Sequence, residues 1–556
     1  MFKKNRNQGQ ISIADPYLQF PKYVQEALQK TWAPYFYKHI FKSINEERFS
    51  ALFSETYSRP NAPVNIMVGL LFLKELNGWI DEEMIGALYF DYRVQYALGI
   101  TDFEKERICV NTVSNFRGRL YEYSTTHGID LLEEEVLALT GVLTTLAGMD
   151  TSLARQGSFM SSANCKKMGR LELIYTTNAN MVKQLAKVDE ALIPESCRHY
   201  LNNDKNDHIY RLKKEEVAGK LKHLLTESLQ LNEAVPESLQ VSQAYLNLIR
   251  MLADQTTQTE TGILPKENNE FSASSLQNPS EPEATFRKKG KKQYTGYVVN
   301  TVEARDEEKA LSMIIHHEQK PNTTSDVELG RNSLDADLEG VEVIANDGAY
   351  YSVETVEKAE ERGIEMGFSA LTGKKASENQ LGVSEFVIDV NDRICACPAG
   401  YAPESSEYST DKETYTAKFA KEHCDACPLF DICPVKEQKK FNTVKFTEKT
   451  LQADICRAKM GEARFKELAA FRAGVEGVPS VLRRKYAIDN IPVRGLNRSR
   501  IWMHCKIMAY NFKSFFGYCK REVKKGEACA FFVSRFQVFF WRRLLHRSKN
   551  ALLPVK

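Results

Sequence analysis

The order of strand-like and helix-like segments between residues 294 and 370 is the feature that most limits the folds open to this chain. β-Branched and aromatic residues gather in two successive strand patterns, and two further strand patterns then alternate with helical ones (294–302, 310–316, helix 326–338, 341–345, helix 352–362, 364–370). The apolar run 142–149 is predicted to add a strand before them. Strands that follow one another before alternation begins predict an α/β fold, with a mixed sheet and helices on both faces.

The remaining segments divide the 556 residues into further parts. The order of elements matches a ribonuclease-H-like core, and about three domains fit the length. Residues 255–283 are rich in Thr, Gln, Glu, Asn, Ser and Pro and are expected to be a loop or disordered linker. The predicted parts are a helical N-terminal DNA-binding domain (1–140), the core (141–160, 284–375 and 445–515), a helical insertion with the polar linker (161–283), a Cys-rich insertion (376–444) and a basic, aromatic C-terminal tail (516–556).

Charge is unevenly distributed along the chain. The totals of 75 basic and 73 acidic residues nearly cancel, but residues 481–556 hold 18 Lys and Arg against 3 Asp and Glu. A basic segment on an acidic body predicts a local polyanion contact. No run of about 18 uncharged apolar residues occurs, and the opening MFKKNRNQGQ lacks the apolar core of a secretion signal. The cytoplasm is the expected location, with no membrane partner.

Two isolated carboxylates end predicted strands. Asp150 follows the run 142–149, and Asp347 follows the strand pattern at 341–345. In the predicted sheet the first and fourth strands are neighbours, so their carboxyl ends would bring the two acids together. Such carboxylates repel each other unless a cation lies between them, and Mg²⁺, or Mn²⁺ in its place, suits oxygen ligands. Two such ions about 4 Å apart could activate the attacking oxygen and stabilise the leaving one in phosphoryl transfer.

A third acid is expected after the helical stretch 448–475. Arg472 precedes Glu476 by one helical turn and Arg483 follows it by two, so the three side chains can lie near one face. That arrangement would place a metal ligand among phosphate-binding cations, to which Lys485 adds. If Glu476 does not serve, the next candidates are on the preceding helix (Glu467 and Glu462).

Cysteines cluster before this acid. Cys395 and Cys397 form a CxC pair, Cys424 and Cys427 form a CxxC pair, and Cys433 is a spare. Zn²⁺ takes four thiolate or imidazole ligands, usually presented in close pairs. One hypothesis is therefore a structural zinc site at the first four cysteines. The other is a set of reduced cysteines without metal.

Residues 60–125 suggest a DNA-binding module. Two predicted helices are followed by a third that Thr112 can cap, with Arg117 and Arg119 in its first turns. Three short helices with basic residues on the last resemble a helix-turn-helix module and predict contacts with DNA bases. A plain helical bundle with solvated arginines is the alternative.

These segments resemble the DDE transposases of bacterial insertion sequences, in the IS1182-like group related to the IS4/IS5-type enzymes. RPNAPVNIMVGLLFLKELNGWIDEEMIGAL and NTVSNFRGRL are similar to the N-terminal domain of that family, and EPEATFRKKGKKQYTGYVVNTVE to a strand segment of its core. GMDTS and VIANDGAYYS resemble the contexts of its first and second catalytic aspartates. In its signature of Tyr, two residues, Arg, three residues, Glu, six residues and Lys, this chain has Arg472, Glu476 and Arg483, with Ala469 in place of Tyr.

The resemblance implies a DNA transposase with a catalytic, Mg²⁺-binding triad of Asp150, Asp347 and Glu476. It would bind double-stranded DNA at the terminal inverted repeats, cut the strands, and join the freed 3′-hydroxyl to target DNA, as a homodimer on the DNA. Arg117 and Arg119 would recognise the end sequence. The residues holding phosphates at the scissile position would be Arg472, Arg483 and Lys485. The alternatives are a nuclease of the same fold without strand transfer and a non-catalytic DNA-binding remnant of a transposase.

Overall fold

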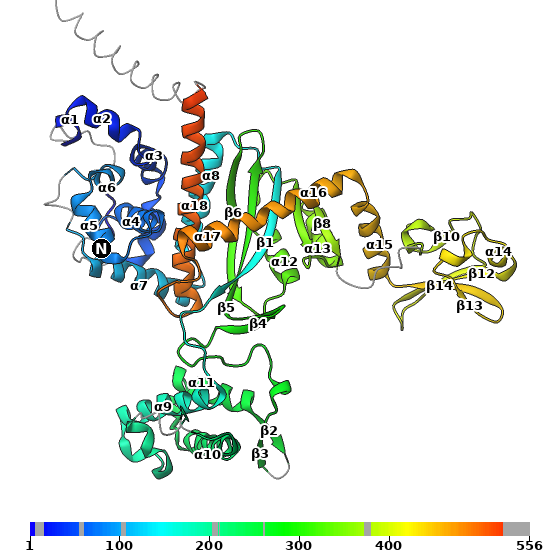
Figure 1. Ribbon diagram of the computed structural model, residues 1–556, viewed down its shortest axis with the longest axis horizontal. Coiled ribbons are helices and arrows are strands. Elements are labelled where there is room, and N and C mark those ends of the chain that lie inside the picture. Colours follow the sequence, from blue (N-terminus) through cyan, green and yellow to red (C-terminus); the bar gives the residue numbers. More distant parts are fainter. Residues whose placement is uncertain are drawn as a thin grey trace, which may run out of the picture.

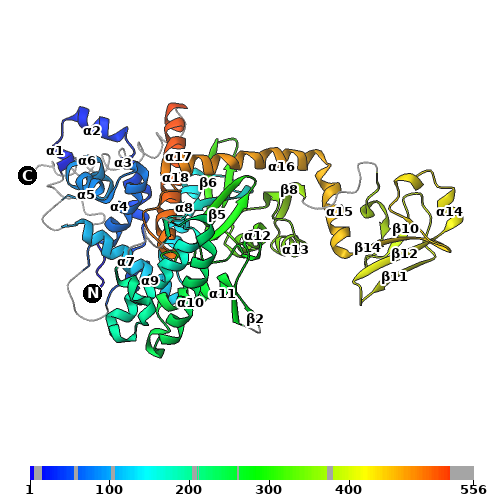
Figure 2. The same ribbon diagram turned by 60° about the horizontal axis from the view of Figure 1, so that its bottom comes forward.

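The structure has a central sheet with three other groups of helices and strands around it. The computed structural model describes residues 1–5, 16–54, 61–101, 107–202, 209–210, 212–259, 262–371 and 380–525. Figure 1 shows helices of the N-terminal region on one side of the sheet, a second helical region at one end, and a small β region at the far side. Figure 2, turned by 60°, shows the same small β region standing away from the rest.

The sheet is mixed, as the sequence predicted. Its main path runs β4-β5-β1-β7-β8, and β6 pairs with β5. β1 is antiparallel to β5 and parallel to β7, which is parallel to β8. The bounds are β1 Leu153–Ser162, β4 Thr285–Lys289, β5 Lys292–Asp306, β6 Leu311–Pro321, β7 Val343–Gly348 and β8 Glu365–Leu371.

Helices cover both faces of this sheet, because alternate residues of a strand point to opposite sides. Ile344 of β7 packs in a cluster with residues of α12 (Asp326–Asp335) and α13 (Val353–Glu361). Its neighbour Ala345 packs instead against Phe465 and Leu468 of α16 (Ala463–Ala473), which crosses the other face (Figure 1).

The strand predicted at 142–149 is wrong. These residues end in α8 (Leu131–Ala147), whose buried residues Val136, Leu139 and Leu143 recur at helical spacing. The chain turns at Gly148, and the first strand of the sheet begins only at Leu153. Asp150 therefore precedes the first strand, and the predicted domain boundary at 141 falls inside a helix.

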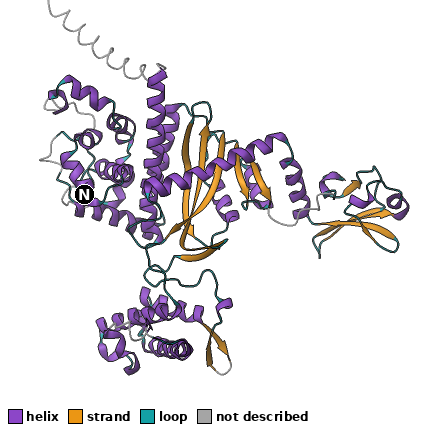
Figure 3. Cartoon of the chain, in the orientation of Figure 1, coloured by secondary structure: helices purple, strands orange, loops and turns teal. Residues whose placement is uncertain are grey.

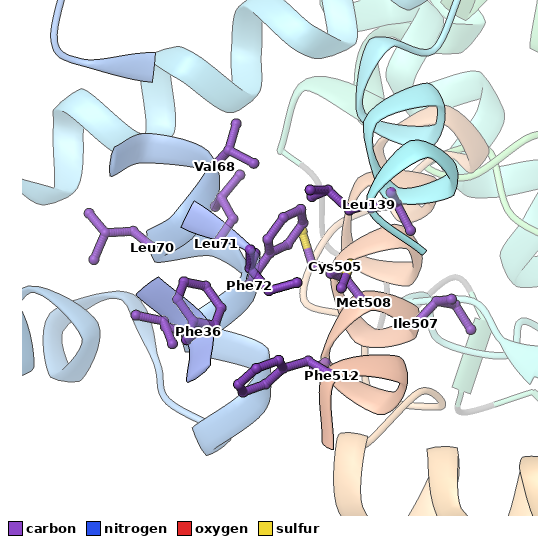
Figure 4. Close-up of a cluster of buried hydrophobic side chains, with 14 of the residues drawn as sticks. Phe36, Val68, Leu70, Leu71, Phe72, Leu139, Cys505, Ile507, Met508 and Phe512 are labelled. Atoms are coloured by element: carbon purple, nitrogen blue, oxygen red, sulfur yellow. The ribbon is translucent and has the colours of Figure 1, made fainter. Parts of the chain in front are cut away.

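The N-terminal helices share one core with the long helix α18 (Leu496–Lys525). In Figure 4, Leu71 and Phe72 of α4, Leu139 of α8 and Met508 of α18 belong to one buried cluster. The tail boundary predicted at 516 falls inside α18, and residues 526–556 lie outside the described part of the chain. The helices are α1 Pro16–Gln19, α2 Lys22–Gln29, α3 Ala33–His39, α4 Val64–Asn77, α5 Asp81–Phe90, α6 Tyr92–Ala97, α7 Val110–His127 and α8.

The insertion after β1 is a helical unit with its own core. It contains α9 (Arg170–Val188), α10 (Val217–Ala234), α11 (Gln243–Gln255) and the hairpin of β2 (Thr256–Thr259) and β3 (Gly262–Pro265). The described part of 255–283 contains the β2–β3 hairpin and is otherwise mostly loop, and it packs on this unit. Leu276 is buried in the core, and the side chains of Asn247 and Arg250 donate to the carbonyls of Pro279 and Pro282 at 2.8 and 2.7 Å.

The Cys-rich region forms a small β unit at the end of α15 (Figure 3). Its main sheet runs β11-β12-β14-β13, and β9 and β10 form a separate pair. The bounds are β9 Val387–Ile388, β10 Ile394–Ala396, β11 Ser405–Ser409, β12 Thr414–Ala420, α14 Lys421–Asp425, β13 Lys436–Glu437, β14 Phe441–Phe446 and α15 Glu448–Met460. Within the described ranges, no helix combines the length and apolar character needed to cross a membrane.

Candidate active site and cysteine site

Asp347 and Glu476 meet on one face of the sheet through Arg472. Arg472, at the end of α16, places Nη2 3.2 Å from Oδ2 of Asp347 and 3.4 Å from Oε1 of Glu476. The side chains of Asp347 and Glu476 are 45% and 70% exposed, whereas that of Arg472 is 18% exposed. Arg472 and Glu476 therefore lie side by side, at a spacing of one helical turn. Two carboxylates open to solvent can accept a cation, while the arginine now balances part of their charge.

Local backbone geometry sets the position of Asp347. It lies next to the end of β7, where the pairing with β8 is irregular between Asn346 and Gly348. A Cβ at Gly348 would overlap the backbone of Ala370, so only glycine fits this close approach of the two strands. Glu476, on the other side of Arg472 from Asp347, ends the 3₁₀ turn η11 (Gly474–Glu476) between α16 and α17 (Gly477–Tyr486).

Asp150 does not join these two acids. Leu153 pairs with Val343 in parallel, so Asp150 lies before one end of this strand pair and Asp347 near the other. From Leu153, where β1 begins, to Gly157, which lies level with Asp347, the strand rises four steps, or roughly 13 Å, and Asp150 precedes that beginning. Asp150 instead receives the backbone N–H of Ser152 at 2.9 Å, a bond that lowers the pKa of its carboxyl. The predicted meeting of Asp150 with Asp347 is wrong, because the expected strand before Asp150 is a helix.

Gly157 occupies the place on β1 that lies level with Asp347. Arg155 pairs with Ala345, and two further steps along both strands reach Gly157 and Asp347. A Cβ on Gly157 would come within 2.9 Å of Val475, the neighbour of Glu476. The position that faces the two acids therefore carries no side chain. In the sequence, the long strand of residues 153–162 that follows Asp150 could have located this position on β1.

On the adjacent strand β5, the acid nearest to the level of Gly157 is Glu303, and its side chain already has hydrogen-bond partners. Glu303 of β5 is buried, accepts from Nε of Arg155 at 2.6 Å, and accepts from the hydroxyl of Tyr510 at 2.9 Å. Arg155 also donates to the carbonyl of Phe471 at 3.2 Å. This buried pair ties β1 and β5 to α16 and α18, which fixes the face on which Asp347 lies.

The predicted phosphate-binding cations lie on α17. Arg483 donates to the carbonyl of Met160 at 2.7 Å and to Asp489 at 3.0 Å, and its guanidinium stacks over Phe159. Lys485 is exposed on the same helix. Both residues follow the 3₁₀ turn that carries Glu476, and Arg483 lies against the end of β1.

The two arginines of α7 have different surroundings. Arg117 is buried, makes an ion pair with Asp81, and stacks 4.7 Å from the ring centre of Trp502. In this structure it holds α5, α7 and α18 together, which corrects its predicted role in reading DNA. Arg119 is exposed and lines an open hollow of about 570 Å³ with Arg498.

The cysteine cluster differs from the predicted set by one residue. Cys397, Cys424, Cys427 and Cys433 line one small cavity of about 30 Å³, whereas Cys395 is exposed and lies near the carbonyl of Arg393. Burial, reinforced by the neighbouring thiols, raises the pKa of Cys424 and Cys433. The four thiols line the same space, but no three of their sulfur atoms form a group in which all lie within 4.8 Å of one another, so a zinc site here would need them to move closer. Cys433 lies with this set and Cys395 does not.

Comparison with known families supports this arrangement of regions. Residues 396–516 match the model of the family described as Transposase DDE domain, and residues 25–119 match that of Transposase domain (DUF772). The first match contains Glu476, and the second contains the end of α2, the helices α3 to α6 and the start of α7. No curated protein and no solved structure matches the chain. Two separate regions of the chain are therefore similar to transposase domains.

Proposed function

We propose that this protein is an insertion-sequence DDE transposase of the IS1182-like type, which binds the terminal inverted repeats of its element, cuts DNA strands in a metal-dependent reaction and transfers them to target DNA. The observation that carries the proposal is the meeting of Asp347, Arg472 and Glu476 on an exposed face of the sheet. The strand order β6-β5-β1-β7-β8, antiparallel and then parallel, supports a ribonuclease-H-like core. In such a core these acids would hold the reacting phosphate through divalent cations.

The chemistry follows from the charges of the three side chains. Mg²⁺ or Mn²⁺ held by Asp347 and Glu476 would polarise the scissile phosphate and lower the pKa of the attacking hydroxyl. Arg472 now shares its guanidinium between both carboxylates. A cation would take over that role and leave Arg472 free to donate to a phosphate oxygen. One site could then serve both hydrolysis and strand transfer, since both are in-line displacements at phosphorus.

DNA contacts are proposed on two surfaces. The hollow on α7, with Arg119 and Arg498, is the candidate for recognition of end sequence, and Arg483 with Lys485 for phosphate binding. We further propose that the protein acts as a homodimer on DNA, in the cytoplasm of a bacterium and associated with its nucleoid. Two copies would allow both ends of the element to be held at once.

Incubation of the full chain with end DNA, a target plasmid and Mg²⁺ tests the proposal. Joined products are the expected result. Cut ends without joining would instead identify a nuclease of the same fold. End binding without metal-dependent cleavage would identify the non-catalytic remnant.

One observation favours that last alternative as a second candidate. Gly157 lies level with Asp347 where a third carboxylate could complete the metal site, and Asp150 precedes the beginning of β1, which is itself roughly 13 Å from that level by strand rise. Among the described residues, no third acid lies close enough to Asp347 and Glu476 to share one ion with them. Under this candidate the chain binds element ends but cleaves them poorly.

A gain of function decides between the two candidates. Gly157→Asp combined with Val475→Ala, which makes room for the new side chain, is expected to raise metal-dependent cleavage if the third acid is missing. Gly157→Asn with Val475→Ala is the matched control, because it has the same shape without the charge. Equal cleavage by the wild type and both double variants would reject the incomplete site.

Replacement of Arg119 or Arg498 by Ala should weaken binding to end DNA more than binding to random DNA. Loss of a base contact costs roughly 1–3 kcal/mol, and titrations on both DNAs measure it. Arg117→Ala should act differently, because removal of one partner of a buried ion pair costs roughly 3–5 kcal/mol of folding stability. Thermal unfolding should therefore identify Arg117 as structural. An unchanged melting temperature with lost end specificity would reverse that assignment.

Replacement of Arg483 or Lys485 by Ala should weaken specific and non-specific DNA binding about equally. Phosphate contacts release counterions and carry no sequence information, so each loss should also make the salt dependence shallower. Binding titrations at several salt concentrations check this. A selective loss on end DNA would instead assign α17 to sequence recognition.

A further inference from the structure

A second group of potential metal ligands lies away from the acidic site. Glu133 of α8, His317 of β6 and His504 of α18 each offer one ligand atom, and these atoms all lie within 4.8 Å of one another. The two histidines are 0% and 1% exposed, and Glu133 is half-buried. The three residues come from distant parts of the sequence, so only the fold brings them together.

The ring of His504 is held in a defined orientation. Its Nε2 lies 3.1 Å from Oδ2 of Asp130, and its Nδ1 lies 2.7 Å from Nε2 of His317. With Nε2 donating to the Asp130 carboxylate, Nδ1 is turned toward the group. A carboxylate behind a histidine in this way is the arrangement that fixes metal-binding imidazoles in proteins.

The group is incompletely satisfied as it stands. The Glu133 side chain makes no hydrogen bond or ion pair to another described residue, although it lies beside two buried rings. The carboxylates of Asp130 and Glu133 carry two negative charges, while the hydrogen-bonded pair of imidazoles carries at most one positive charge. A divalent cation would balance their charge and give Glu133 a ligand role.

We propose that Glu133, His317 and His504 bind one divalent transition-metal ion of the zinc class. Two imidazoles and one carboxylate suit such an ion, whereas Mg²⁺ prefers oxygen ligands. The ion would replace the hydrogen bond between the imidazoles, and the proton of that bond would leave to solvent. Because its ligands lie on α8, β6 and α18, the ion would join the N-terminal helices to the central sheet and to α18.

Cobalt titration of the full-length protein, freed of metal by a chelator and kept reduced, tests the site. Co²⁺ bound by the cysteine cluster gives intense thiolate charge-transfer absorption, whereas Co²⁺ bound by imidazole and carboxylate gives only weak visible bands. We expect one equivalent of the second kind. Glu133→Gln should weaken this component by at least about tenfold, as loss of a ligand-sphere group does. Glu134→Gln, the neighbouring exposed residue, is the matched control and should leave it unchanged.

Two outcomes would overturn the site. One is a cobalt spectrum that contains only the thiolate component. The other is equal affinity of the imidazole component in wild type, Glu133→Gln and His317→Gln. His317 is fully buried, so its variant could fail to fold, and Glu133→Gln then decides alone because this side chain is half-buried and the change conserves its shape. The measurement requires no DNA, so its failure leaves the proposed transposase activity untouched.

Discussion

Metal-dependent cleavage of end DNA should be lost when Asp347 is replaced by Asn or Glu476 by Gln, while end binding persists. The amide oxygens are neutral and bind Mg²⁺ poorly, so the cations that stabilise the transition state would lose their site. Loss of several kcal/mol of that stabilisation corresponds to roughly a thousandfold or more in rate. Single-turnover cleavage of labelled end DNA, next to a binding titration on the same DNA, measures both properties.

Two matched variants make this test specific. Glu467→Gln alters an exposed acid on α16 that makes no contact with Arg472 or Asp347, and should cleave normally. Asp150→Asn should also cleave normally, because Asp150 lies at the opposite end of the strand pair. Loss of cleavage in Asp150→Asn, with normal binding, would mean that the chain rearranges to bring this acid to the others.

Removal of metal from the cysteine site should unfold the Cys-rich region and leave the rest of the chain folded. Its apolar core is small, with residues such as Phe386, Phe419 and Val444, and small cores depend on metals or disulfides. A structural zinc ion contributes about 10–16 kcal/mol in small zinc domains. Cys433→Ser should therefore lose the metal and expose residues 380–446 to proteolysis. Cys395→Ser is the control, since this exposed thiol lies outside the cavity.

Elemental analysis and limited proteolysis of the two serine variants measure the outcome. Zinc retained in Cys433→Ser and lost in Cys395→Ser would restore the CxC pair as ligands. The metal site would be rejected if protein that is kept reduced contains no metal and its Cys-rich region still resists proteolysis.

The sheet was predictable because its strands and helices have clear periods. The segments that became β5, β6, α12, β7, α13 and β8 were located within a few residues. The run 142–149 was misassigned because a short apolar run does not distinguish a strand from the end of a helix. The helical spacing of Val136, Leu139 and Leu143 becomes clear only when the window begins earlier. That single error moved Asp150 to the wrong end of β1.

Other errors came from partners that lie far away in sequence. Arg117 resembles an exposed basic residue of a recognition helix until Asp81 and Trp502 are placed beside it. The choice between Cys395 and Cys433 depends on which thiol turns into the cavity, and spacing alone does not contain that information. The pairing of Arg472 with Glu476 was predictable because it is local, at one helical turn.

The position of α18 has a consequence for synthesis of the protein on the ribosome. The apolar surface of α4 is covered by residues of α18, such as Met508 and Phe512, that emerge some 350 residues after α8. At a synthesis rate of about 5–20 residues per second, α18 is made roughly 20–70 s after the N-terminal helices. A product terminated after Glu476 would contain both acids of the candidate site and yet leave that surface open to aggregation and proteolysis. The N-terminal helices can reach their packed form only after residue 519 has been added.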